Sequence, residues 1–298
     1  MTSATPHLTG ASSTSSLANE AISTHDVVVE GHRLRLYENG DRNRPHVLWL
    51  HGSGPGVNAL ANWRDIMTAF SGEYHNVAPD VLGFGNSECP DPFPRGIMPT
   101  VQYRAENLLA LLDELEMDSV HIVGNSMGGM IALRMALLAP SRVDRIVLMG
   151  SAADGGLSPL AVEKQMRFVR ERSLSALTDL LRSFVYDEET FGVALEDVAA
   201  ERLALALDPE IARVAAATFD PEPGPLSFPP AELGRIVQPT LVVHGREDRI
   251  LPIERAVYLA QHISDAHLHV VPRSGHWAHL EQPETFRFLM RAFLDGNL

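Results

Sequence analysis

The 298-residue chain is poor in several features that mark whole classes of proteins. It has one cysteine, Cys89, so no disulfide can form within the chain, and this usage is typical of a reducing compartment such as the cytoplasm. No apolar run approaches the roughly 20 residues that a membrane-spanning helix requires. No cluster of cysteine and histidine has the spacing of metal ligands. We therefore expect a cytoplasmic protein with no membrane span and no metal.

Basic residues are also few. The chain has 24 Lys and Arg against 38 Asp and Glu, which gives a formal net charge of −14. This balance argues against nucleic acid and against an anionic membrane surface as partners. It also means that an anionic substrate would need a local cation to hold it. Hydrophobic residues make up 45% of the chain, which is enough for one large α/β domain with an insertion.

Three kinds of segment follow one another along the chain. Eleven of the first 24 residues are Ser or Thr, with neither the basic start nor the apolar core of a secretory signal, and residues 1–24 are predicted to be a flexible tail. Apolar runs alternate with helical patterns over residues 25–150 and 236–298, which predicts a mostly parallel sheet flanked by helices. Residues 151–235 have helical patterns at 159–171, 174–185 and 195–218 but no strand-like run. They predict an inserted helical cap over the strand ends.

The most informative motif is Gly-Asn-Ser-Met-Gly at residues 124–128, which lies between a strand-like run and a helical run. A Ser in Gly-x-Ser-x-Gly at such a junction is the nucleophile elbow of α/β-hydrolases. The strained turn lifts the Ser hydroxyl clear of the backbone, so the residues two places away on either side must be small, and both are Gly. The helix that follows also favours negative charge near its first turn. Ser126 is therefore predicted to be the nucleophile.

Two more residues fall where this chemistry requires them. Asp248 and His276 each follow an apolar run, and the chain order Ser, acid, His is that of an α/β-hydrolase triad. His276 would take the proton from Ser126 and return it to the leaving group. Asp248 would hold the imidazole tautomer and stabilise the imidazolium. Glu247 is the alternative acid, one residue earlier in the same turn.

A glycine-rich loop upstream completes the predicted machinery. The apolar run 46–50 leads directly into HGSGPG at residues 51–56. Such a loop supplies one backbone N–H to an oxyanion hole, and the residue after the nucleophile supplies the other. The predicted donors are the amides of Ser53 and Met127. A plain Gly/Pro turn is the alternative interpretation of this loop.

Four segments together resemble one family, the meta-cleavage-product hydrolases, which are α/β-hydrolases that break a carbon–carbon bond in ring-fission products of aromatic catabolism. These segments are HGSGPGVNALANWR (51–64), GNSMGG (124–129), GREDRILP (245–252) and SGHWAHLE (274–281). The resemblance implies an α/β-hydrolase fold with an inserted cap and no cofactor. It also implies an anionic substrate, a 2-hydroxy-6-oxohexa-2,4-dienoate. We further expect a homo-oligomer, a dimer or larger.

The resemblance assigns further residues to the substrate site. Asn62 and Asn125 match positions that face the substrate, Trp277 matches a pocket residue, and Arg202 matches a cap arginine that binds the 2-hydroxy-carboxylate end. Gly52 and Gly54 of the glycine-rich loop belong to the same site. Each has a structural alternative: Asn62 as a helix N-cap, Asn125 as a turn cap, Trp277 as core packing, and Arg202 as an exposed partner of Glu196 or Glu201.

Two other functions stay open at this point. One is a carboxylesterase-type serine hydrolase with the same triad, which would turn over a simple aryl ester in preference to a dienoate. The other is a non-catalytic ligand-binding protein on the same fold, which would not need all three triad residues. A dehalogenase or epoxide hydrolase is disfavoured, because those enzymes have Asp where this chain has Ser126.

Overall fold

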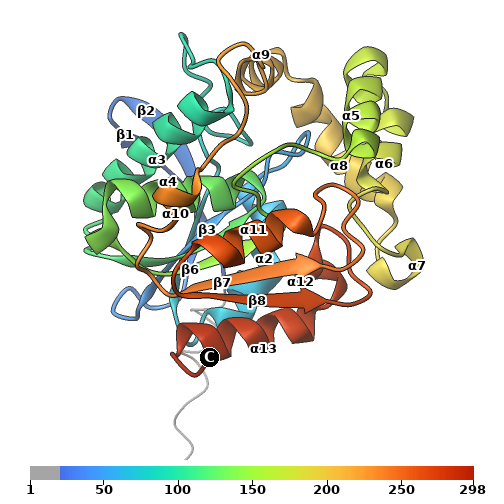
Figure 1. Cartoon of the computed structure of the whole chain (residues 1–298). Helices are drawn as coiled ribbons and strands as arrows, with labels where there is room; N and C mark the ends of the chain where they lie inside the picture. The colour runs from blue at the N-terminus through green and yellow to red at the C-terminus, as the bar shows by residue number, and fades with distance from the viewer. Residues whose placement is uncertain (1–20) are drawn as a thin grey trace, which may run out of the picture.

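The computed structural model describes residues 21–298, and its centre is one eight-stranded sheet. The strand order is β1-β2-β4-β3-β5-β6-β7-β8, and the strands from β3 to β8 are parallel, while β2 pairs antiparallel with both β1 and β4. This confirms the predicted fold class (Figure 1). The strands are β1 (Ser23–Val29), β2 (His32–Asn39), β3 (His46–Leu50), β4 (His75–Pro79), β5 (Val120–Asn125), β6 (Val143–Met149), β7 (Thr240–Gly245) and β8 (Ala266–Val271).

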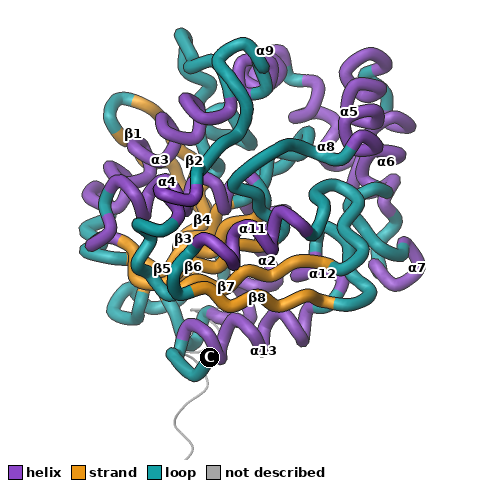
Figure 2. The backbone as a smooth tube through the Cα atoms, viewed as in Figure 1, coloured by secondary structure: helices purple, strands orange, loops and turns teal. Residues whose placement is uncertain are grey.

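Helices cover both faces of the sheet, and alternating residues of each central strand supply the two cores. In β3, Val47 and Trp49 face one core while Leu48 and Leu50 face the other. The first core is covered by α2 (Ala59–Phe70), α12 (Ala278–Glu281) and α13 (Pro283–Leu294), and the second by α3 (Ile97–Glu114), α4 (Met127–Leu138) and α11 (Glu254–His262). Burial of the central strands on both faces explains their near-continuous apolar sequences. Figure 2 shows the strands as the middle layer between these helices.

Between β6 and β7 the chain forms a group of helices, and no named strand lies in this part of the described chain. These helices are α5 (Pro159–Glu171), α6 (Leu174–Leu181), α7 (Glu188–Phe191), α8 (Leu195–Leu207), α9 (Pro209–Thr218) and α10 (Pro230–Leu233). A single isolated bridge joins Asp154 to Ser227 at the base of the segment. Figure 1 shows α5 to α9 as a separate layer beside the sheet.

Several predicted boundaries were wrong. The pattern at 195–218 is two helices, because Asp208 ends α8 and caps α9 by accepting hydrogen bonds from two backbone amides of the next turn, and Pro209 follows at the first helical position. The pattern at 174–185 ends as a helix at Leu181. β8 is an edge strand, and two of its six residues are exposed.

The predicted N-terminal tail was too long. Residues 23 and 24 belong to β1, which pairs with β2 along its whole length. Residues 1–20 of the predicted tail lie outside the described residues. Within the described part of the chain, no helix is long and apolar enough to cross a membrane.

Candidate active site

Ser126 stands at the junction of β5 and α4 in a strained backbone conformation, with φ 53° and ψ −117°. Such a conformation is costly for a residue with a side chain, and it persists only where the surroundings enforce it. A Cβ atom at Gly124 would lie 2.4 Å from the nitrogen of Gly129, and one at Gly128 would lie 2.2 Å from the carbonyl oxygen of Leu50. The two glycines are therefore required by close backbone approach on both sides of the turn.

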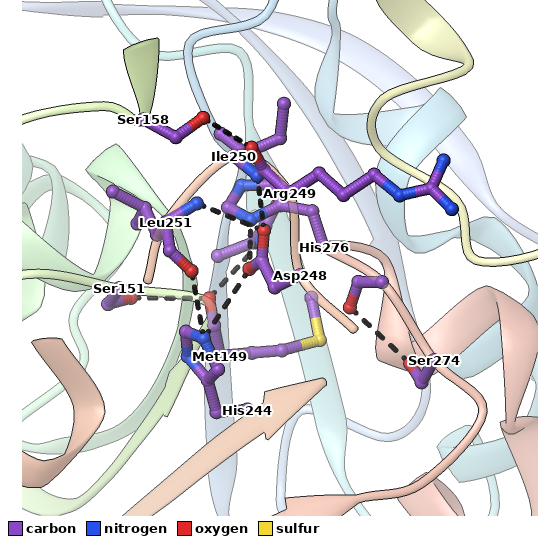
Figure 3. Close-up of polar contacts among 12 residues, drawn as sticks. Met149, Ser151, Ser158, His244, Asp248, Arg249, Ile250, Leu251, Ser274 and His276 are labelled. Carbon is purple, nitrogen blue, oxygen red and sulfur yellow. Dashed lines mark hydrogen bonds and ion pairs between the residues drawn. The ribbon is translucent and has the colours of Figure 1, made fainter. Parts of the chain in front are cut away.

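His276 and Asp248 form a buried hydrogen-bonded pair at the ends of β8 and β7. Nδ1 of His276 lies 2.7 Å from Oδ2 of Asp248, while Oδ1 of Asp248 accepts from the amides of Ile250 at 2.7 Å and Leu251 at 3.0 Å (Figure 3). A carboxylate must accept from Nδ1–H, so Nε2 of His276 carries no proton in the neutral imidazole. The backbone amide of His276 donates to the carbonyl of Phe184 at 2.7 Å, so the 151–235 segment helps to hold the loop that carries His276.

The charge on Asp248 is maintained despite burial. Burial alone would raise its pKa, but the charge and hydrogen bond of His276 outweigh that effect, and the pKa lies below its ordinary value. The alternative acid, Glu247, points elsewhere. Its carboxylate accepts from the Ser274 amide at 3.1 Å and pairs with Arg246. The structure thus places Asp248, and not Glu247, against His276.

The two amides predicted as oxyanion donors flank Ser126. Met127 is the first residue of α4, and a Cβ atom built on Gly52, next to Ser53, would lie 3.3 Å from Cβ of Ser126. Among residues 21–298, neither the Ser53 nor the Met127 amide has a hydrogen-bond acceptor. Both N–H groups are therefore available to an oxygen atom bound beside Ser126.

A small cavity of about 40 Å³ lies between the core and the helical segment, and both contribute to its wall. A second cavity of about 480 Å³ lies between α5 and α9 and shares part of its wall with the first. Residues from the core and from the 151–235 segment line the small cavity, including Gly52, Ser53, Gly54, Asn62, Asn125, Ser126, Leu157, Ala161, Gln165, Leu180, Phe184, Arg202, Ile250, His276 and Trp277.

Arg202 enters this cavity from α8 as a buried, unpaired cation. Its side chain is only 6% exposed, and its guanidinium carbon lies 4.9 Å from the ring centre of Trp277. Within the described chain it forms no ion pair, and its Nε is buried without a partner. Burial lowers its pKa to about 10, opposed by the charge of Glu201, so it stays protonated at neutral pH. The alternative of an exposed helix partner for Glu196 or Glu201 is wrong.

The two asparagines differ in how much of their hydrogen bonding the protein satisfies. Asn58, and not Asn62, caps α2, which begins at Ala59. Asn62 is buried inside the first turns of that helix, and its side-chain Nδ2 has no partner among the described residues although it lines the cavity. Nδ2 of Asn125 donates to the Met149 carbonyl at 3.2 Å, and its Oδ1 lies against Gly52. Asn62 therefore has a free donor, and Asn125 is already held in place.

Trp277 combines the two roles considered for it. It is 3% exposed and its ring lies 4.9 Å from that of Phe184 and 6.0 Å from that of Phe191, yet it also lines the cavity beneath Arg202. Gly54 is also close, since an added Cβ there would be 3.9 Å from Nη1 of Arg202. The guanidinium thus lies near both an aromatic face and the glycine-rich loop.

Sequence reasoning missed most of the apolar wall. Leu157, Ala161, Gln165, Leu180 and Phe184 line the cavity from the helical segment, but none of them stands in a motif. Only their three-dimensional placement distinguishes them from other helix residues. No group of three or more His, Cys, Asp or Glu side chains in residues 21–298 could hold a metal ion.

Comparisons with known proteins agree with this geometry. A family model described as the alpha/beta hydrolase fold matches residues 45–283. The chain is similar to a 2-hydroxymuconate semialdehyde hydrolase of Pseudomonas sp. strain CF600, with 34% identity over 90% of this chain and 93% of that protein. It is also similar to a 2-hydroxy-6-oxo-2,4-heptadienoate hydrolase of Pseudomonas putida, with 35% identity over 90% and 95%.

Among solved structures, a 2-hydroxy-6-oxo-6-phenylhexa-2,4-dienoate hydrolase from Rhodococcus sp. strain RHA1 superposes with a TM-score of 0.85. Its sequence is 37% identical to this chain, and the match covers 92% of this chain and 99% of that one.

Proposed function

The chain belongs to the meta-cleavage-product hydrolases of the α/β-hydrolase family, and from that premise we propose that it hydrolyses the C5–C6 bond of a 2-hydroxy-6-oxohexa-2,4-dienoate. One observation carries the assignment of this site. A buried guanidinium without an anionic partner, Arg202, lines the same small cavity as Ser126 and the His276–Asp248 pair. A simple ester needs no such cation, whereas a dienoate carries a carboxylate and an acidic enol.

Binding of the dienoate follows from the charges and free donors of the cavity. The planar guanidinium of Arg202 matches a carboxylate or α-keto acid in bidentate fashion, and the Trp277 ring beneath its central carbon restricts its movement. The unpaired Nδ2 of Asn62 donates to a substrate oxygen, which removes the cost of leaving this buried group unsatisfied. The carboxylate end therefore lies at the Arg202 side of the cavity, and C6 lies at Ser126.

The chemistry has two stages. The enol first becomes the keto form as a proton moves from the 2-hydroxyl group to C5. The C6 carbonyl is then attacked by Ser126, or by a water molecule activated through His276. The negative charge that develops on the C6 oxygen is stabilised by the amides of Ser53 and Met127, each worth on the order of 3 kcal/mol in the transition state.

The C5–C6 bond then breaks, and its electron pair delocalises through the conjugated keto acid. Protonation gives 2-hydroxypentadienoate, and the acyl half leaves as a carboxylic acid once water has added to C6. His276 shuttles the proton at Nε2 in each step, with Asp248 holding Nδ1–H. These residues need no cofactor for the reaction.

The wall opposite Arg202 supports an uncharged substituent at C6. Apart from Arg202 and the catalytic His276, the described residues that line the small cavity have no acidic or basic side chain, and Leu157, Ala161 and Ile250 are apolar. The small cavity of about 40 Å³ is less than the roughly 150 Å³ of an engineered cavity that binds benzene, so the substrate extends into the neighbouring 480 Å³ cavity between α5 and α9, whose wall is mostly apolar.

Three broader assignments accompany this proposal. We propose that residues 151–235 act as a cap that selects the substrate, because seven of the 18 residues that line the small cavity come from this segment. We also propose a cytoplasmic homo-oligomer, supported by the single Cys89 and by the open edge of β8. Light scattering on the purified protein tests the oligomer, and a purely monomeric mass would refute it.

A spectrophotometric panel tests the function. The purified protein should bleach dienoates with hydrogen, methyl or phenyl at C6, and it should act far more slowly on one with a carboxyethyl group or on a neutral aryl ester. Preference for the ester would identify a carboxylesterase. Binding of the dienoate without turnover by wild type would identify a non-catalytic ligand-binding protein.

A further inference from the structure

His51, the residue before Gly52, is fully buried and makes two hydrogen bonds that fix its protonation. Its Nδ1 lies 2.7 Å from the carbonyl oxygen of Gly52, and its Nε2 lies 3.1 Å from the backbone nitrogen of Val81. A carbonyl can only accept a hydrogen bond and an amide N–H can only donate one. The ring is therefore neutral, with its proton on Nδ1 and a bare Nε2.

The Gly52 carbonyl belongs to the same planar peptide group as the Ser53 amide. In a trans peptide the C=O and N–H bonds point in opposite directions. Holding the carbonyl toward His51 therefore turns the Ser53 N–H the other way. That other side is the reaction site, because Ser53 lines the cavity and an added Cβ on Gly52 would lie 3.3 Å from Cβ of Ser126.

We propose that His51 is a positioning residue for the oxyanion hole, and that its Nδ1–H aims the Ser53 amide by holding the Gly52 carbonyl. The inference rests on the proposed function, since it takes Ser53 as an oxyanion donor. The loop needs such a restraint because glycines at 52, 54 and 56 leave its backbone unusually free. An oxyanion donor is effective only when its direction is fixed before the charge develops.

The surroundings hold the His51 ring on its other sides. The Phe84 ring, in the loop after β4, meets the His51 ring edge to face at 5.5 Å. Arg104 holds that loop by donating to the Leu82 carbonyl at 3.0 Å, and its guanidinium carbon lies 5.0 Å from the centre of the Phe84 ring. Together with the hydrogen bond from the Val81 amide, these contacts fix the His51 ring between the loop after β4 and the glycine-rich loop.

Burial, and two nearby cations in addition, keep His51 neutral. Burial lowers its pKa to about 4, and the guanidinium groups of Arg104 and Arg202 act in the same direction. The Gly52 hydrogen bond opposes them only in part. At the pH of a hydrolase assay the ring therefore stays in the form that can both donate from Nδ1 and accept at Nε2.

Two substitutions separate the two hydrogen bonds. The amide nitrogen of Asn stands where Nδ1 of His stands, so His51→Asn can keep the donor to Gly52 while losing the acceptor for Val81. The amide oxygen of Gln reaches the position of Nε2, so His51→Gln can keep the acceptor for Val81 and loses the donor to Gly52. If His51 aims the Ser53 amide, Asn must preserve activity better than Gln.

We expect His51→Gln to lower kcat by roughly 10²-fold, the scale of a misplaced oxyanion donor, with KM nearly unchanged because only the transition state uses the donor. His51→Asn should keep kcat within about tenfold of wild type. A boronic acid, which forms a tetrahedral anionic adduct with the nucleophile, should bind His51→Gln correspondingly more weakly. The affinity for 2-hydroxypentadienoate, the planar product, should not change.

Equal loss in the two variants, or a change confined to KM, would overturn the proposal and leave His51 as packing. Should His51→Gln not fold, NMR of wild type labelled with ¹⁵N-histidine decides the point, with His51→Asn identifying the signal. A proton on Nδ1 supports the proposal, and a proton on Nε2 refutes it.

Ester turnover separates this inference from the proposed function. An aryl ester uses the same oxyanion hole, so the order wild type, Asn, Gln should hold for it too. If wild type cleaves esters but no dienoate, the proposed function fails, and the ester series alone still decides the role of His51.

Discussion

Replacing Arg202 by Met should impair activity on dienoates while leaving the folded protein as stable as before, or more so. The guanidinium is buried with no anionic partner in the described chain, and burial lowers its pKa to about 10. An unpaired buried charge disfavours folding, and an apolar side chain of similar length removes that cost. In the complex, the same charge gains the substrate carboxylate as its partner.

The size of the effect follows from the lost interaction. A hydrogen bond to a charged group is worth about 1.5–3 kcal/mol, so kcat/KM for a dienoate should fall roughly 10- to 100-fold, since 1.4 kcal/mol is about tenfold. The activity of Arg202→Lys should lie between those of wild type and Arg202→Met, because Lys keeps the charge but loses the planar fork that lies over Trp277. Arg170→Met, at an exposed arginine of α5 that does not line the cavity, is the matched control.

The assay compares initial rates on a C6-methyl dienoate and on a neutral aryl ester, with thermal unfolding of each variant measured alongside. Ester rates should stay within about threefold of wild type, because the ester has no carboxylate for Arg202 to bind. An equal loss on both substrates would show that Arg202 acts through the fold of the cavity. Unchanged rates on both would remove it from substrate binding altogether.

Three further outcomes follow from the site. Ser126→Ala should lower kcat by at least about 10³-fold without loss of structure. Ser126→Gly should be equally inactive, but its unfolding free energy in urea should be roughly 1 kcal/mol higher than that of Ser126→Ala, since glycine relieves the positive φ of 53°. Asp248→Asn should cost roughly 10⁴-fold in kcat while Glu247→Gln is nearly silent, and the reverse pattern would contradict the geometry. Burial raises the pKa of Asp80 from 3.8 to about 6, so the folded state holds this proton more tightly than the unfolded state does. The unfolding free energy of wild type, measured in urea relative to that of Asp80→Asn, should therefore fall as the pH rises from about 4 to 6. A difference between the two proteins that stays the same at every pH would refute this.

The catalytic residues were predictable because their signals are local. The elbow motif specifies its own turn, and Asp248 and His276 each follow an apolar strand, so parallel topology alone brings them to one edge of the sheet. The break at 208–209 also had a local signal, since Asp followed by Pro and Glu is typical of a helix start. The apolar wall had none. Phe184 reaches the catalytic loop through its carbonyl, which accepts from the His276 amide, and through its ring, which lies against those of His276 and Trp277, although these residues are more than 90 positions further along the chain.

Arg202 shows where sequence reasoning reaches its limit. The residues around it on α8 are apolar on several sides, so the helical pattern does not tell which face is buried, and only the family resemblance pointed to its role. The structure settles its burial, because an added Cβ at Gly56 would lie 2.1 Å from the Arg202 carbonyl oxygen. The glycine-rich loop and α8 are in backbone contact, and this contact directs the guanidinium inward.

The distribution of charge explains how a protein of net charge −14 can act on an anion. Exposed carboxylates are screened by salt over about 8 Å, so they contribute little inside a closed cavity. Two guanidinium groups, Arg104 and Arg202, are buried near the glycine-rich loop, and both lower the pKa of His51. Burial also lowers the pKa of Arg104, to about 9, which leaves it protonated at neutral pH. Two buried cations thus lie near the places where the carboxylate binds and the oxyanion forms, so the net charge of the surface does not decide whether an anion can bind.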